Sequence, residues 1–113
     1  MIPKELIPAL KDLVHELVAG NFRKLERDGR AGRLTAKDLH HVLEGYGRTL
    51  IDLPDEAFQI GEAYPIEGKE DQYWAVDLDL WTLEEGRSDL TLTLTVRTTD
   101  KGVLTEIDDL HAL

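Results

Sequence analysis

The sequence has 113 residues, of which 42% are hydrophobic and 32% charged, a composition typical of one folded domain. It contains no cysteine, which excludes disulfide bonds and thiolate metal sites. Its formal net charge of −10 disfavours the binding of nucleic acid or anionic lipid through the surface as a whole.

The first half of the chain has the apolar spacing of helices. Pro3 is placed to begin a first helix, and Gly20 with Asn21 is placed to end it. A short second helix is predicted over residues 22–28. The buried stripe of the first helix consists of four leucines at helical spacing: Leu6, Leu10, Leu13 and Leu17.

A third helix is predicted after a loop that contains glycine. Thr35 and Asp38 have the spacing of a capping box at its start. Gly45 and Gly47 are expected to break it. Its apolar stripe is formed by four residues: Leu39, Val42, Leu43 and Tyr46.

After residue 48 the apolar period changes to two, which is typical of strands. A short strand is predicted over residues 49–51, then a helical turn from Pro54, a weak strand over residues 60–66, and a turn over residues 67–71. Two long strands follow, with inward rows of Trp74, Val76, Leu78 and Leu80, and of Leu90, Leu92, Leu94 and Val96.

The last strand begins at Val103. Its alternation slips between Ile107 and Leu110, which predicts a β-bulge at Asp108 and Asp109. Long strands joined by short turns form an antiparallel meander, and the N-terminal helices are the only cover for its apolar face. We therefore predict one α+β domain over residues 1–113, with helices in residues 3–46 packed on one face of a curved sheet in residues 49–113.

The charges are unevenly distributed along the chain. Residues 22–49 contain seven Lys or Arg against four acids, a net charge of +3. Residues 50–113 contain four against sixteen, a net charge of −12. The acidic half either serves solubility or forms a sheet surface that meets a basic partner.

Polar residues gather on the outward rows of the predicted sheet. Asp77 and Asp79 share a face with Trp81, because alternate residues of a strand point the same way. Such a face can be solvated, can bind a partner, or can hold a catalytic or metal site, and tryptophan is enriched where proteins bind one another. We predict a partner-binding surface formed by six residues: Asp77, Asp79, Trp81, Asp108, Asp109 and His111.

Other motifs do not predict catalysis, a cofactor or a metal. Ser88 is the only serine and lacks the flanking glycines of a nucleophile elbow. His40 and His41 are adjacent and so face different directions on a helix. A basic run around the second helix is either a solvated surface or a site for an anionic ligand: Arg23, Lys24, Arg27, Arg30 and Arg33.

The order of three helices, a short strand, a helical turn and four longer strands resembles the cone-shaped NTF2-like fold. The stretch 73–82, then 85–92, and the ending Ile107-Asp108-Asp109-Leu110-His111 also resemble a family of small acidic bacterial proteins. That resemblance implies a link to the immunity partners of bacterial toxins. NTF2-like enzymes place an Asp–His or Tyr–Asp pair in a pocket, and neither pair is matched here.

We consider three hypotheses. The first is a cytoplasmic immunity protein or inhibitor that binds a toxin with a basic surface and is not an enzyme. The second is an NTF2-like protein that binds or converts a small molecule in a pocket between helices and sheet. The third is a homodimeric structural domain. We expect no nucleic acid, and no membrane partner, because no leader pattern or apolar run of about 18 residues occurs.

Overall fold

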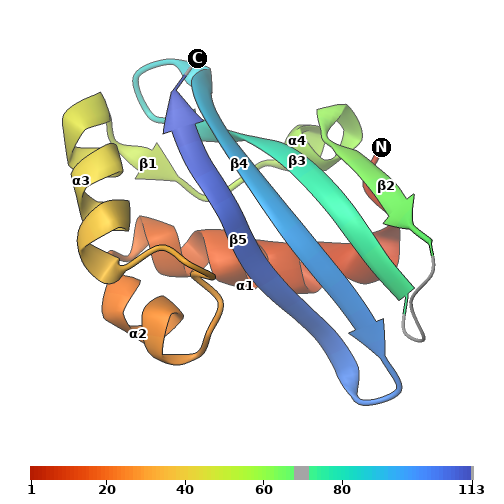
Figure 1. Ribbon diagram of the computed structural model, residues 1–113. Coiled ribbons are helices and arrows are strands. Elements are labelled where there is room, and N and C mark those ends of the chain that lie inside the picture. Colours follow the sequence, from red (N-terminus) through yellow and green to blue (C-terminus); the bar gives the residue numbers. More distant parts are fainter. Residues whose placement is uncertain (68–71, 113) are drawn as a thin grey trace.

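The computed structural model describes residues 1–67 and 72–112 (Figure 1). The turn expected at residues 67–71 lies, apart from Glu67, outside these residues. The elements follow in the order η1 (Lys4–Leu6), α1 (Ile7–Val18), α2 (Phe22–Arg27), α3 (Ala36–Tyr46), β1 (Leu50–Ile51), α4 (Asp55–Ile60), β2 (Glu62–Ile66), β3 (Gln72–Thr82), β4 (Gly86–Thr99) and β5 (Gly102–Ala112).

The ends of α3 show which local signals were read correctly. Thr35 Oγ1 accepts from the Asp38 N–H at 3.1 Å, and the Asp38 carboxylate accepts from the Thr35 N–H at 2.9 Å, which confirms the capping box. The expected break at Gly45 is wrong, since α3 passes through it and ends at Gly47. An interior glycine costs only about 1 kcal/mol, whereas the left-handed φ of 73° at Gly47 ends the helix.

The sheet is antiparallel, in the order β1-β3-β4-β5, and β2 pairs with the first part of β3. On β4 and β5, Thr93 lies opposite Asp109 and Leu94 opposite Ile107, so Asp108 is the extra residue of a bulge. The predicted bulge is confirmed. It explains why Leu110 points inward although the alternation along the sequence has slipped.

A second irregularity was not anticipated. Between Asp79 and Trp81 on β3, the register with β4 shifts by two residues. The Ser88 hydroxyl donates to the Leu80 carbonyl at 2.7 Å and accepts from the Leu90 N–H at 3.1 Å, so its buried side chain replaces ladder bonds. An even shift keeps every side chain on its face.

The core lies between α1 and one face of the sheet. In Figure 1, α1 crosses behind the sheet, α2 and α3 lie beside β5, and no helix covers the face toward the viewer. The four leucines predicted for the first helix, Leu6 in η1 and three in α1, are buried against the inward rows of β3 and β4, although Trp74 is only half-buried. The sheet curls around this core, so the structure is α+β and consistent with a cone-like fold.

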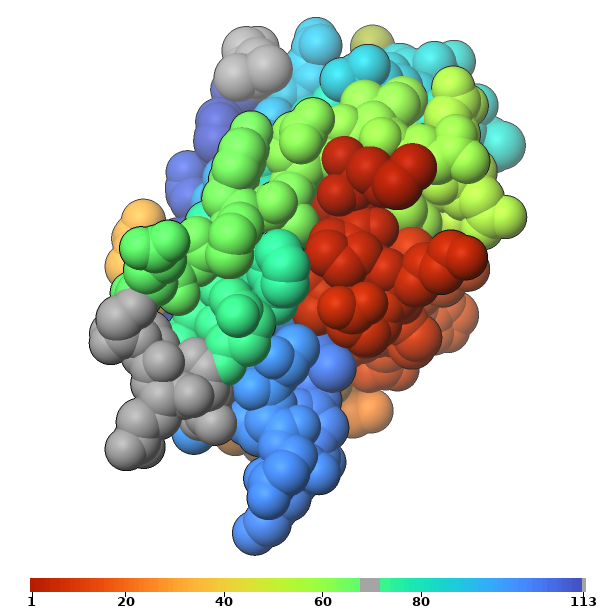
Figure 2. Space-filling model, turned by 90° about the vertical axis from the view of Figure 1, so that its right-hand side faces the viewer, coloured from red at the N-terminus to blue at the C-terminus, as the bar shows by residue number. Residues whose placement is uncertain are grey.

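Two backbone hydrogen bonds join segments at opposite edges of the molecule. The Ile2 N–H donates to the Phe58 carbonyl at 2.9 Å, and Figure 2 shows the N-terminal residues lying against α4 and β2. At the opposite edge, the Ile107 N–H of β5 donates to the Arg30 carbonyl at 2.7 Å. A side chain at Gly32, where φ is +61°, would meet the Ile107 carbonyl, so only glycine allows this approach. No helix among the described residues is long and apolar enough to cross a membrane.

Candidate functional site on the outer face of the sheet

The face of the sheet that carries no helix is called the outer face below. Strand register joins its side chains into rows that run across the strands. One row runs Glu62, Asp77, Thr93 and Asp109 from β2 to β5. The next row runs Asp79, Thr91 and His111, and Trp81 lies beyond it opposite Arg87.

The structure therefore brings the predicted residues onto one surface but not into one cluster. Asp77 and Asp109 lie two strands apart, at a backbone separation of about 10 Å, with Thr93 between them. Among the residues that the structure describes, no group of three or more His, Asp or Glu side chains is placed to hold a metal ion. The arrangement is a broad acidic surface.

Most carboxylates of this surface have local partners. Asp79 accepts from Arg87 Nε at 2.7 Å and lies 2.6 Å from its Nη2. Asp108 accepts from the Thr95 hydroxyl at 2.8 Å. Asp109 lies 2.9 Å from Nδ1 of His111, but the two atoms are not aligned for a hydrogen bond.

Asp77 differs from these neighbours. It is exposed, and it has no hydrogen bond or ion pair to any other residue in the described ranges. The register places it beside Glu62 on β2, whose carboxylate lies 3.6 Å from the N-terminal amine. Asp77 is thus the most accessible carboxylate at the centre of the row.

Trp81 shares this face with Asp77 and Asp79, as predicted, but it is not fully exposed. It is half-buried and packs against the edge of the core, with Ile51 beside it on β1. Gly86 leaves room for its ring, since a methyl group there would lie 3.7 Å from Cζ3. Its Nε1 is buried without a hydrogen-bond partner among the described residues.

The other half of the outer face carries exposed apolar side chains beside Arg97 and Glu106, and the sequence pattern did not single them out. Two of its side chains are among the most exposed large hydrophobic groups, Tyr64 at 54% and Leu104 at 58%. Ile66 and Tyr73 lie in the same cross-strand row as Leu104. Only the register shows that these residues are neighbours.

The charge of the outer face is strongly unbalanced. Among described residues that register or contacts place there, six are acids and two are arginines, a net charge of −4. The acids are Glu62, Asp77, Asp79, Glu106, Asp108 and Asp109, and the arginines are Arg87 and Arg97. Glu62, Glu106 and the two arginines were not singled out from the sequence, because their neighbours on this face depend on pairing.

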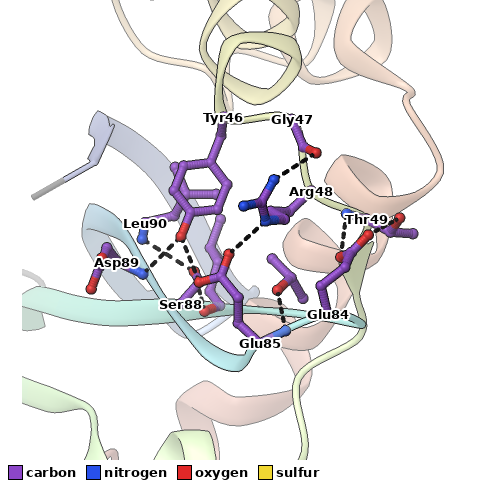
Figure 3. Close-up of polar contacts among 11 residues, drawn as sticks. Tyr46, Gly47, Arg48, Thr49, Glu84, Glu85, Ser88, Asp89 and Leu90 are labelled. Carbon is purple, nitrogen blue, oxygen red and sulfur yellow. Dashed lines mark hydrogen bonds and ion pairs between the residues drawn. The ribbon is translucent and has the colours of Figure 1, made fainter.

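A polar latch holds the β3–β4 turn at the Trp81 end of this face (Figure 3). The Tyr46 hydroxyl donates to Glu85 at 2.8 Å and accepts from the Asp89 N–H at 3.2 Å. The N–H and the hydroxyl of Thr49 both donate to Glu84 at 2.8 Å. These bonds, the backbone one first, hold the pKa of Glu84 below its ordinary value of 4.5.

Two further histidines lie close to carboxylates, and one hollow lies beside β5. His40 lies 2.6 Å from Glu44, four residues on in α3, and His15 lies 3.0 Å from Asp52 on an exposed surface. A hollow of about 570 Å³ lies where α1 and the 28–30 loop approach β5, and the residues lining it include Arg30. Arg30 is already paired with Asp12 and Asp28 there.

Comparison with known proteins identifies the family. A family model described as a domain of unknown function (DUF7668) matches residues 14–113, which is most of the chain. The chain therefore belongs to this family. No curated protein and no solved structure matches it.

Proposed function

We propose that this DUF7668 protein is a binding protein whose outer sheet face engages a protein partner with a basic surface. The observation that carries the proposal is the row Glu62, Asp77, Thr93 and Asp109, which no helix in the described part of the chain covers (Figure 1). Three carboxylates in one row repel one another, and a cationic partner would remove that repulsion.

The paired and the unpaired carboxylates would have different roles in binding the partner. Asp79 and Asp108 are held by Arg87 and Thr95, so they are fixed in position before a partner arrives. Asp77 is unpaired within the described residues and can accept a new charge-assisted bond without losing an old one. We therefore assign Asp77 the largest role in binding.

The exposed apolar side chains in the other half of the face would supply binding affinity that charge alone does not. Charged rims accelerate association, whereas desolvated apolar groups provide most of the affinity. Tyr64 and Leu104 lie on the same face as the acidic rows and are exposed. The partner would accordingly have a basic patch flanked by an apolar patch.

This chemistry favours a different protein over a second copy of the chain. Stacking two outer faces would bring net charges of −4 toward each other, and the two arginines would not balance them. Toxins that act on nucleic acid carry basic clefts to attract phosphates. An immunity protein that fills such a cleft is the finer form of the proposal, and the resemblance to small acidic bacterial proteins supports it.

A second candidate is a small-molecule binder or enzyme that uses the hollow beside β5. Its lining combines Tyr73, Arg97 and Thr105 with the paired Arg30. The middle of the helix–sheet interface is filled by leucines, so a ligand would have to enter at this end. We rank this candidate second because the ion pairs of Arg30 would have to be broken or shared.

The test begins with the product of the adjacent gene, purified and measured for association with this protein. We expect Asp77→Lys to slow association at least about tenfold at low salt. Glu5→Lys makes the same charge change at an exposed position of η1 and is the matched control, for which less than a twofold effect is expected. Leu104→Ser should raise the dissociation rate instead.

The outcome that rejects the proposal is clear. If the partner binds Asp77→Lys, Trp81→Ala and Leu104→Ser as tightly as the parent protein, the outer face is not its site. Equal slowing by Asp77→Lys and Glu5→Lys would point to net charge alone rather than to this surface.

A further inference from the structure

A second surface of opposite charge lies between α2 and α3. The two helices form an open groove of about 1260 Å³, away from the outer face. Its cationic lining comes from both walls, with Arg23, Lys24 and Arg27 on α2 and Lys37 on α3. This groove is called the α2–α3 groove below.

The spacing of the cations places like charges side by side. Arg23 and Arg27 are four residues apart and share one face of α2, and Lys37 adds a third positive charge from α3. Like charges at such spacing destabilise a helix by a few tenths of a kcal/mol. In a chain of net charge −10, nothing about solubility requires this local excess.

Three of the groove cations have no partner among the described residues. Within the described ranges, no ion pair or hydrogen bond involves Arg23, Arg27 or Lys37, whereas Lys24 lies 3.5 Å from Glu16. The one acid of the lining, Glu26, accepts from the Ala36 N–H at 2.5 Å and so caps α3. Its charge is directed at the helix end rather than at an arginine.

Aromatic rings lie in the same groove. The rings of Phe22 and His40 are 6.0 Å apart, at an angle of 55°. Three unpaired cations on two walls suit an anion with more than one phosphate, and the rings offer a surface for a flat base. The net negative charge of the protein repels a long polyanion. Salt screens charges more than about 8 Å away, so a short polyanion in the groove interacts mainly with the nearby cations.

We propose that the α2–α3 groove binds a small polyphosphate ligand, such as a nucleoside triphosphate. The phosphates contact Arg23, Arg27 and Lys37, and a base, where present, contacts Phe22 and His40. The inference does not depend on the proposed function, because the groove and the outer face share no residues. It would give the protein a ligand that acts independently of its protein partner.

The test is a calorimetric titration with tripolyphosphate, ATP and a single-stranded oligonucleotide of about twelve residues, at about 100 mM salt. We expect millimolar or tighter binding of tripolyphosphate and at least tenfold weaker binding by Arg23→Ala/Arg27→Ala. Lys4→Ala/Lys101→Ala removes the same charge from exposed sites outside the groove and should change binding less than twofold. Circular dichroism verifies that each variant is folded.

Comparing the three ligands shows whether the groove recognises a nucleotide or the phosphate chain alone. Tighter binding of ATP than of tripolyphosphate identifies a nucleotide, and equal binding identifies the phosphate chain; both support the groove. If neither ATP nor tripolyphosphate binds, the proposal is overturned. It is also overturned by equal weakening in the two double variants, or by tighter binding of the oligonucleotide than of both small ligands.

Discussion

The two faces of the sheet alternate residue by residue along the same strands, yet they differ in composition and in contacts. On β4, Leu92 and Leu94 are at most 1% exposed and pack in the core, while Thr93 between them faces outward. The inner face is in contact with α1 and carries most of the apolar burial. The outer face contributes little to folding, so its acids and exposed apolar groups are free to serve binding.

Truncation of a core leucine should show the largest difference in stability between the inner and the outer face. Leu92→Ala is expected to lower the free energy of unfolding by about 2–5 kcal/mol, because the side chain is fully buried on the central part of β4. Thr93→Ala, one residue away on the outer face, should change it by less than about 0.5 kcal/mol. Denaturant unfolding measures both, and a loss below about 1 kcal/mol for Leu92→Ala would refute the assigned inner face.

The latch tests whether one end of the outer face is held by specific bonds. Tyr46→Phe removes the bonds to Glu85 and to the Asp89 N–H, and we expect a loss of about 1–2 kcal/mol in the free energy of unfolding. Tyr64→Phe is the control, since that tyrosine is exposed on β2 and should tolerate the change. Equal effects of the two substitutions would contradict a role for the latch.

The ion pair of the outer face should have a smaller effect on stability. Asp79→Ala leaves Arg87 without its partner but half-exposed to water, so we expect a cost of about 0.5–1 kcal/mol. Asp77→Ala should cost less still, or stabilise slightly, since it removes repulsion within the row. A cost above about 2 kcal/mol for Asp79→Ala would mean that the outer face takes part in folding.

The smallest effect expected is a pH dependence at the latch. Bonds from Thr49 lower the pKa of Glu84 in the folded protein below 4.5, so the unfolded chain binds more protons near that pH. The stability that Glu84 contributes is therefore present above about pH 4.5 and lost as the pH falls through the lowered pKa. Glu84→Gln should be less stable than the parent protein near pH 7, and the difference should shrink toward about pH 3.

Unfolding curves at several pH values measure this difference. Asp38, whose pKa is lowered by bonds from Thr35, is present in both proteins, so its contribution cancels in the comparison. A difference between the two proteins that stays constant with pH would show that the bonds from Thr49 do not favour the ionised form of Glu84.

Much of the fold was predictable because its signals are local. Helical spacing identified the buried leucines of α1, Thr35 and Asp38 identified the start of α3, and the alternation of β5 identified the bulge at Asp108. Each of these depends on residues a few positions apart. The error at Gly45 arose because glycine lowers helix stability without preventing a helix, and packing of the neighbouring turns outweighed its preference.

The candidate site was predictable only in part, for the same reason. Alternation by itself determined that Asp77 and Asp79 share a face and that the acids lie opposite the core. Only the tertiary structure decided that Thr93 separates Asp77 from Asp109, that Arg87 pairs with Asp79, and that Tyr46 reaches Glu85 across 39 positions. The side on which a residue lies follows from the local period of its strand, whereas its neighbours follow from register and chain path, which no local pattern contains.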